Sequence, residues 1–202
     1  MFYKNILWVF MMSVFLSSCG EENQVRTVSQ PDTSSTNTFY VGNKAPLASS
    51  PLIKLPIGSI KPNGWLKKKL ELQADGFHGH LPEISKYLEK QNNAWLDPEG
   101  KGKHGWEEVP YWLKGYSNCA YVLGNESMIQ ESMEWIEAAL NSQQEDGWFG
   151  PGHDRGGAAT RLQGRADLWP NMIMLYNLQN YYEYAGDERV LKLMKDYFKY
   201  LQ

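Results

Sequence analysis

The fold is decided by residues 113–129, LKGYSNCAYVLGNESMI, whose pattern recurs at residues 175–191 as LYNLQNYYEYAGDERVL. In each copy an apolar helical run ends at Gly-Asn-Glu or Gly-Asp-Glu, and a second apolar helical run follows. Glycine supplies the left-handed residue that ends a helix, asparagine or aspartate caps the next helix, and glutamate favours its positive N-terminal end. The sequence therefore predicts two tight helical hairpins, a repeat typical of stacked helix pairs or α/α toroids.

Hydrophobic periodicity predicts further helices from about residue 51 onward. Apolar residues three or four positions apart indicate helices over 65–72, 81–88, 109–123, 129–140, 168–182 and 190–198. No convincing strand with a period of two is found. The expected fold class is all-α, an α/α toroid of the six-hairpin type, with these helices forming about its first half. Because six helices are about half of a twelve-helix toroid, we expect a fragment or a truncated product. The seam that a half toroid exposes predicts poor stability of this product alone.

The composition excludes several classes of function. The chain has 202 residues, 20 Lys+Arg against 23 Asp+Glu and a formal net charge of −3, which excludes electrostatic capture of nucleic acid as the main activity. The hydrophobic content of 42% is enough for a packed core. Two cysteines exclude a disulfide-stapled scaffold and a four-cysteine zinc site within this chain.

The N-terminal fifty residues are predicted to be a secretory signal and a flexible tether. Residues 1–18 have the proportions of a secretory signal, with an apolar run too short to span a bilayer. Leu16-Ser17-Ser18-Cys19 resembles a bacterial lipobox, which predicts lipidation of Cys19, and Glu21-Glu22 resembles the acidic export signal of surface lipoproteins. Residues 19–50 are predicted to form the lipidated cysteine and a flexible tether, although residues 39–41 are candidates to pack on the domain at 51–202 or to begin a short strand.

Two long connections, about 91–108 and 145–167, separate the predicted hairpins. If the helices alternate in direction, the Gly-Asn and Gly-Asp turns occupy one end of the stack and both connections occupy the other. Structureless loops of this length are usually functional. Their aromatic rings suit the apolar face of a sugar, and their polar groups suit its hydroxyls. The candidate substrate-binding residues are His104, Trp106, Asp146, Trp148, His153, Asp154 and Arg155.

Glu107 and Glu108 are the candidate catalytic residues, either as hydrogen-bond acceptors or as a general acid if burial beside Trp106 raises the pKa of one carboxyl group. The alternative is that both stabilise the helix dipole. Consecutive helical residues point about 100° apart, so at most one should face the centre.

The other loop residues also have structural alternatives. Asp146 precedes a glycine and suits a turn. His153, Asp154 and Arg155 suit a surface ion pair, whereas in a pocket Arg155 would clamp a substrate carboxylate. Aromatic residues at helical spacing, such as Trp112, are expected in the core.

Three motifs occur in a fixed order, 105–112 (GWEEVPYW), 142–151 (SQQEDGWFGP) and 167–172 (DLWPNM). Together they resemble the β-L-arabinofuranosidase-like family, glycoside hydrolase family 127 and its relatives, over roughly Leu52–Gln202. The resemblance implies the N-terminal part of an (α/α)₆ barrel catalytic domain. It also implies exo-acting removal of furanose-type sugars from plant glycans.

The resemblance further implies a cysteine nucleophile held by zinc, with glutamate and cysteine ligands in the later part of the barrel. The sequence has no such cluster, so the nucleophile is unassigned, no cofactor is visible in this chain, and zinc is an expectation for the full-length family. Cys119 lies within a predicted helix outside the loops, which indicates a packing role. His78 and His80 are too few donors for a metal site, and none is predicted.

We therefore expect a glycosidase whose partners are an oligo- or polysaccharide and, through the N-terminal lipid, a membrane, with no nucleic acid. The expected location is the cell envelope, as a surface-exposed outer-membrane lipoprotein, with the periplasm as the alternative. Two other functions stay open. One is an α/α-toroid polysaccharide lyase or unsaturated uronyl hydrolase, and the other is a helical surface lipoprotein that binds glycans without cleaving them.

Overall fold

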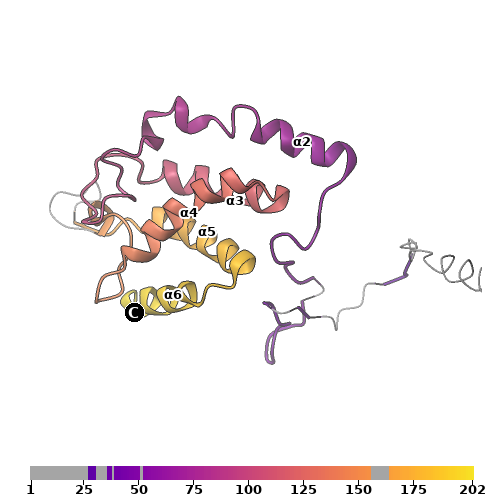
Figure 1. Cartoon of the computed structure of the whole chain (residues 1–202). Helices are drawn as coiled ribbons and strands as arrows, with labels where there is room; N and C mark the ends of the chain where they lie inside the picture. The colour runs from indigo at the N-terminus through magenta and orange to yellow at the C-terminus, as the bar shows by residue number, and fades with distance from the viewer. Residues whose placement is uncertain (1–26, 31–35, 38, 51, 156–163) are drawn as a thin grey trace, which may run out of the picture. The chain divides into compact units, whose positions relative to one another are not determined.

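The computed structural model describes residues 27–30, 36–37, 39–50, 52–155 and 164–202. The predicted signal segment at 1–18 and Cys19 lie outside these residues. The chain divides into two compact units, of which one includes Gly42–Ile53 and the other, the helical unit, consists of Asn37–Val41 and Lys54–Gln202. All helices labelled in Figure 1 belong to the helical unit.

The described residues form five α-helices and no β-strand. The helices are α2 (Gly64–Ala74), α3 (Glu108–Leu123), α4 (Glu126–Asn141), α5 (Trp169–Ala185) and α6 (Glu188–Tyr200). Short 3₁₀ turns cover Leu81–Glu83, Lys86–Leu88 and Gly152–Arg155, and one isolated bridge joins Asn93 to His104. The all-α prediction is confirmed for this part of the chain. None of the described helices is long and apolar enough to cross a membrane.

Both predicted hairpins are present. Gly124 ends α3 with a φ of 65°, and the side chain of Asn125 accepts a hydrogen bond from the backbone nitrogen of Met128. Gly186 ends α5 with a φ of 70°, and the side chain of Asp187 accepts one from the backbone nitrogen of Arg189. The repeated sequence thus makes the same glycine-terminated, side-chain-capped turn twice.

The helix predicted at 81–88 is wrong, so the described residues form five of the six expected α-helices. Two 3₁₀ turns cover this segment, and Ser85 between them is extended, with φ −101° and ψ 112°. Ile84 is 67% exposed, so the spacing of Ile84 and Leu88 does not make a buried face. Pro82 lies in the first of the two turns.

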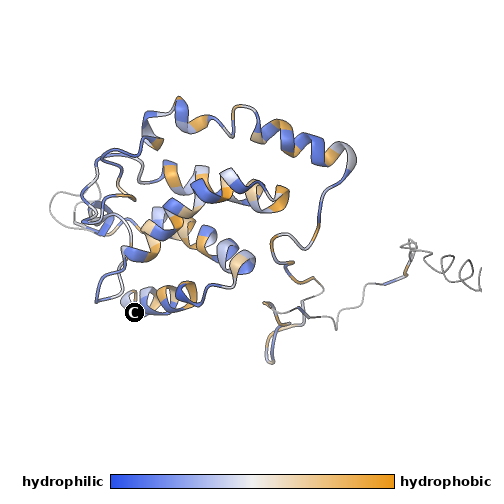
Figure 2. Cartoon of the chain, in the orientation of Figure 1, coloured by the Kyte–Doolittle hydropathy of each residue, from blue (hydrophilic) through white to orange (hydrophobic). Residues whose placement is uncertain are grey.

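The core lies around α3, which packs against α2, α4 and α5, while α6 packs against α4 and α5. Figure 2 shows apolar and polar segments interleaved along these helices. The core position expected for Trp112 is confirmed, because its ring is buried edge to face against the fully buried ring of Trp135, with centroids 5.8 Å apart.

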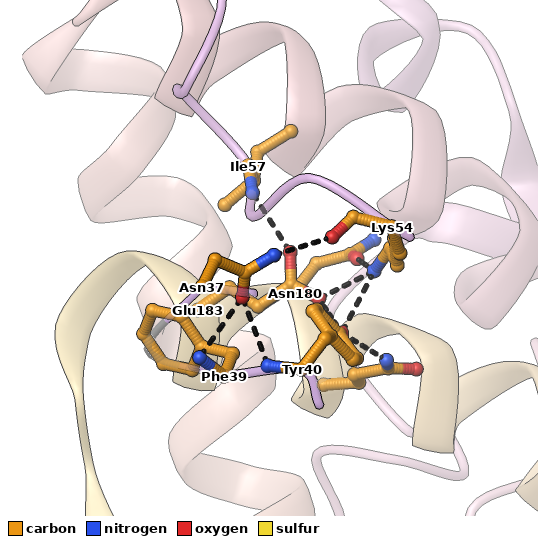
Figure 3. A network of polar contacts seen from close by, with 8 residues as sticks. Asn37, Phe39, Tyr40, Lys54, Ile57, Asn180 and Glu183 are labelled. Atoms are coloured by element: carbon orange, nitrogen blue, oxygen red, sulfur yellow. Dashed lines mark hydrogen bonds and ion pairs between the residues drawn. The ribbon is translucent and has the colours of Figure 1, made fainter. Parts of the chain in front are cut away.

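Residues of the segment Asn37–Val41 pack on α5. Phe39 lies edge to face against Tyr182, with ring centroids 5.4 Å apart, and the Tyr40 hydroxyl donates to the buried Glu183 carboxylate. The packing considered for residues 39–41 is thus present, although the sequence places them in the predicted tether. Figure 3 shows the polar contacts that surround Glu183.

The glycines that end α3 and α5 in the left-handed conformation give a stability prediction. A Cβ added at Gly124 would meet no atom within 4 Å, so the Gly124→Ala variant tests backbone conformation alone. We expect Gly124→Ala to lower the free energy of unfolding by about 1 kcal/mol, and Gly124→Asn to lower it less, because asparagine tolerates the left-handed region. Urea unfolding followed by circular dichroism measures both, and equal losses would contradict this explanation.

Candidate functional site

The two long loops meet at one end of the helical unit, as the alternation of helices predicts. The backbone nitrogen of Gly152 donates to the Gly100 carbonyl oxygen at 3.0 Å. The rings of Trp106 and His153 stack with centroids 4.7 Å apart. Glycine is required at position 100, because its φ is 65° and a Cβ would lie 2.8 Å from the Gly152 nitrogen.

The first loop is organised by Asn93, which is fully buried. Its Nδ2 donates to the carbonyl oxygens of Tyr87 and Glu89, both at 3.1 Å, and its Oδ1 accepts from the backbone nitrogen of Trp95 at 3.1 Å. The Trp95 indole nitrogen in turn donates to the Trp106 carbonyl oxygen at 2.9 Å. These bonds satisfy buried polar groups and hold the backbone of Trp106 at the loop junction.

The second loop is anchored by side chains from the ends of two helices. The hydroxyl of Ser142, which caps the C-terminus of α4, accepts from the Gly150 nitrogen at 2.7 Å. Asn171 in the first turn of α5 donates to the Phe149 carbonyl oxygen at 2.7 Å. These two bonds hold Phe149 and Gly150 against the ends of α4 and α5, just before the loop reaches His153.

A cavity of about 140 Å³ lies where the loops meet, lined by Trp106, Glu107, Glu108, His153 and Asp154. A wider groove of about 640 Å³ continues from it along Glu99–Lys103 and shares Trp106 and His153 with it. The groove is within the roughly 300–1,000 Å³ typical of small-molecule sites. We call the cavity and the groove together the rim site.

The rim site combines three carboxylates with aromatic rings. Asp154 is 4% exposed, and its Oδ1 lies 3.5 Å from the Nδ1 of His153. Glu107 is half-buried directly before α3, and Glu108 is the exposed first residue of that helix. The indole nitrogen of Trp106 is buried without a hydrogen-bond partner among the described residues. The site can therefore offer carboxylate acceptors, an indole donor and a ring surface to one ligand.

Both predicted catalytic glutamates line the cavity, whereas at most one was expected to face it. Glu107 is the N-cap residue, and its φ of −93° and ψ of −38° lie in the right-handed helical region. The cavity lies at the start of α3 rather than along one side of it, because this segment contributes Trp106, Glu107 and Glu108 to the lining and no later residue of the helix.

Four predicted substrate-binding residues lie outside the cavity lining. The ring of Trp148 is fully buried edge to face against Tyr197 and Tyr200, so it is a core residue in this structure. Burial raises the pKa of Tyr197 to about 12. The Nε2 of His104 lies 3.1 Å from the Glu89 carbonyl oxygen, within the first loop.

Asp146 and Arg155 form an ion pair with each other, whereas the surface ion pair was expected among His153, Asp154 and Arg155. Asp146 Oδ1 also accepts from the Trp148 nitrogen at 3.2 Å and shapes the turn. Arg155 also donates to Gln144 and lies over the Tyr200 ring, 5.7 Å from its centroid. These contacts hold the Arg155 guanidinium within the second loop.

Sequence reasoning missed Asn93, Gly100 and Gly152, which set the loop geometry. The available signal was local: Asn92 and Asn93 precede Trp95, and glycines recur at 100, 102 and 105. A Cβ at Gly102 would lie 2.3 Å from the Asn93 backbone, so that glycine permits a close approach.

Cys119 is buried in α3, with its Sγ 3.8 Å from the Leu70 carbonyl oxygen. This placement confirms the predicted packing role. Within the described part of the chain, no group of three or more His, Cys, Asp or Glu residues is arranged to hold a metal ion.

Comparison with family models finds a match over residues 33–202 to the model described as Beta-L-arabinofuranosidase, GH127 catalytic domain. No curated protein and no solved structure matches the chain. The family match covers the helical unit and both loops of the rim site.

The burial of Cys119 predicts low thiol reactivity. Burial raises the pKa of this thiol, so less thiolate is present near pH 8 than for a free cysteine. We expect the thiol of Cys119 to react with Ellman's reagent only after unfolding in guanidinium. The Cys119→Ala variant identifies its signal, because that variant should lack the reactivity gained on unfolding. Rapid reaction of the folded protein at Cys119 would show an accessible thiol.

Proposed function

Because the chain belongs to the GH127 β-L-arabinofuranosidase catalytic-domain family, we propose that it is a β-L-arabinofuranosidase-like glycoside hydrolase that acts on terminal sugars of plant-type glycans. The observation that carries the proposal is the rim site, in which Glu107, Glu108 and Asp154 line one cavity with Trp106 and His153. Carboxylates and aromatic rings are the groups that bind sugar hydroxyls and the apolar face of a sugar ring.

We assign binding roles to the rim residues. Trp106 presents its ring to the sugar and donates from its buried indole nitrogen. Glu107 and Glu108 accept hydrogen bonds from hydroxyl groups, because the N-terminus of α3 favours negative charge at these positions. Asp154 orients the His153 imidazole that stacks on Trp106. These groups would position the glycosidic bond and exclude water from part of the sugar.

No described residue is assigned the role of nucleophile or zinc ligand. Cys119 packs inside the helical unit rather than at the rim. The described residues that line the cavity include carboxylates but no cysteine.

We also propose that α3–α6 form part of an α/α toroid. Two features support this arrangement. α3 and α5 pack together, and each leads through a glycine turn into a following helix, α4 or α6. Successive hairpins of this kind place alternate helices in two layers.

Glycan binding without cleavage is the second candidate function. It is favoured by the open groove along Glu99–Lys103, which suits a longer saccharide, and by the absence of a cysteine from the rim as described. The family match weighs against the third function considered, a polysaccharide lyase or unsaturated uronyl hydrolase.

An envelope location through a lipid on Cys19 is part of the proposal. Support comes from the sequence alone, where small residues and an apolar run precede Cys19. Metabolic labelling with palmitate in a bacterial host should label the wild-type chain and not Cys19→Ser. Label retained by Cys19→Ser would exclude this anchor.

The proposed function predicts loss of substrate affinity on removal of the Trp106 ring. We expect Trp106→Ala to weaken binding of a β-L-arabinofuranosyl disaccharide about tenfold or more, since buried aromatic contacts contribute much of a site's binding free energy. Isothermal titration calorimetry measures the affinity. Trp65→Ala is the matched control, because Trp65 is a 74% exposed tryptophan on α2.

Cleavage is tested in parallel with 4-nitrophenyl β-L-arabinofuranoside. Release of nitrophenol that falls in Trp106→Ala and not in Trp65→Ala supports the glycosidase. Binding that depends on Trp106, without release, supports the second candidate function. Equal binding by both variants would show that the rim site does not bind the sugar, which would contradict both candidate functions.

A further inference from the structure

A second pocket lies on the face shared by α3 and α5. Its volume is about 420 Å³, and its wall includes Lys114 and Asn118 of α3 and Glu183 of α5. It shares no lining residue with the rim site. Asn118 lies ten residues after Glu108 on α3, which corresponds to about 15 Å along an α-helix. We call it the α3–α5 pocket.

The negative charge in this pocket is already compensated. The Glu183 side chain is 1% exposed and forms an ion pair with Lys54. Its carboxylate also accepts from the Tyr40 hydroxyl and from the Ile57 backbone nitrogen, the latter at 2.7 Å. Figure 3 shows these donors gathered around the carboxylate. A buried carboxylate with this many donors repels an incoming anion only weakly.

The positive charge of Lys114 is not compensated. Its Nζ lies 5.0 Å from the centroid of the Tyr176 ring on α5, and it forms no ion pair with any described residue. The side chain of Lys114 is exposed. Of the two lysines in the pocket wall, Lys54 is paired with Glu183, so the ammonium group available to a ligand carboxylate is that of Lys114, which lies beside the Tyr176 ring.

Asn118 supplies an acceptor that needs a donor. Its Oδ1 is buried, and no described residue hydrogen-bonds to it. A buried acceptor without a partner costs free energy, which a ligand hydroxyl would recover on binding. The apolar part of the wall comes from Leu55 and Ile57.

We propose that the α3–α5 pocket binds a hexuronate, either free or as a unit of an acidic glycan. The ligand carboxylate accepts from Lys114 Nζ, a ring hydroxyl donates to Asn118 Oδ1, and the apolar face of the ring lies against Leu55 and Ile57. A neutral sugar would leave the Lys114 charge unused, and a simple carboxylate would leave Asn118 without a donor. This site does not depend on the proposed glycosidase activity.

Titration calorimetry of the full chain with sodium D-galacturonate and with D-galactose tests the proposal. We expect galacturonate to bind about tenfold more tightly than galactose, and Lys114→Met to remove that difference, since a charge-assisted hydrogen bond is lost. Asn118→Leu should weaken both sugars. Trp106→Ala should leave galacturonate binding unchanged, which separates this site from the rim site.

Lys195→Met is the matched control, because Lys195 is an exposed lysine on α6 outside the pocket and its loss changes the net charge equally. Circular dichroism melting of each variant confirms that it is folded. The proposal is overturned if galactose and galacturonate bind equally, if Lys114→Met binds like the wild type, or if Lys195→Met weakens binding as much as Lys114→Met.

Discussion

The packing of α3 against α5 determines where every proposed site lies. Near the start of the two helices, the Trp169 indole donates to the Tyr111 hydroxyl at 2.9 Å. Near their ends, the rings of Tyr121 and Tyr184 stack with centroids 4.2 Å apart. These contacts place the first turns of both helices at one end. The loops that precede the two helices must therefore meet there, and the rim site is the result.

The helices α3–α6 were predictable because their signals act within a few residues. An apolar period of three or four, a glycine that adopts a positive φ and an Asn or Asp that caps the next helix are all local. The failure at 81–88 has the opposite cause. Ile84 and Leu88 satisfy the spacing, but only Leu88 is buried, and the extended Ser85 interrupts any helix between them. The spacing of apolar residues along the sequence does not show which of them become buried against distant parts of the chain.

The meeting of the loops was predictable from topology, but the direction of their side chains was not. Trp106 and Trp148 each follow a glycine in a long loop, so the sequence treats them alike. In the structure Trp148 is fully buried against Tyr197 and Tyr200 of α6, and Trp106 lines the cavity. The difference comes from a helix that begins about forty residues after Trp148. A local pattern holds no information about such a distant contact.

Polar side chains on the buried face of α5 explain how one helix can position three separate parts of the chain. Asn171 donates to the Phe149 carbonyl oxygen of the second loop, and Asn177 donates to the Pro110 carbonyl oxygen of α3 at 3.0 Å. Glu183 accepts from the backbone nitrogen of Ile57. A hydrogen bond requires its donor and acceptor to lie within a narrow range of distance and angle, so these bonds restrict the positions of their partners more closely than apolar contact does. Loss of any one bond would leave a buried polar group unsatisfied, at a cost of about 1–3 kcal/mol. The polar side chains of α5 therefore fix the positions of the second loop, of α3 and of Ile57 relative to α5. In this way they connect the geometry of the rim site to that of the α3–α5 pocket.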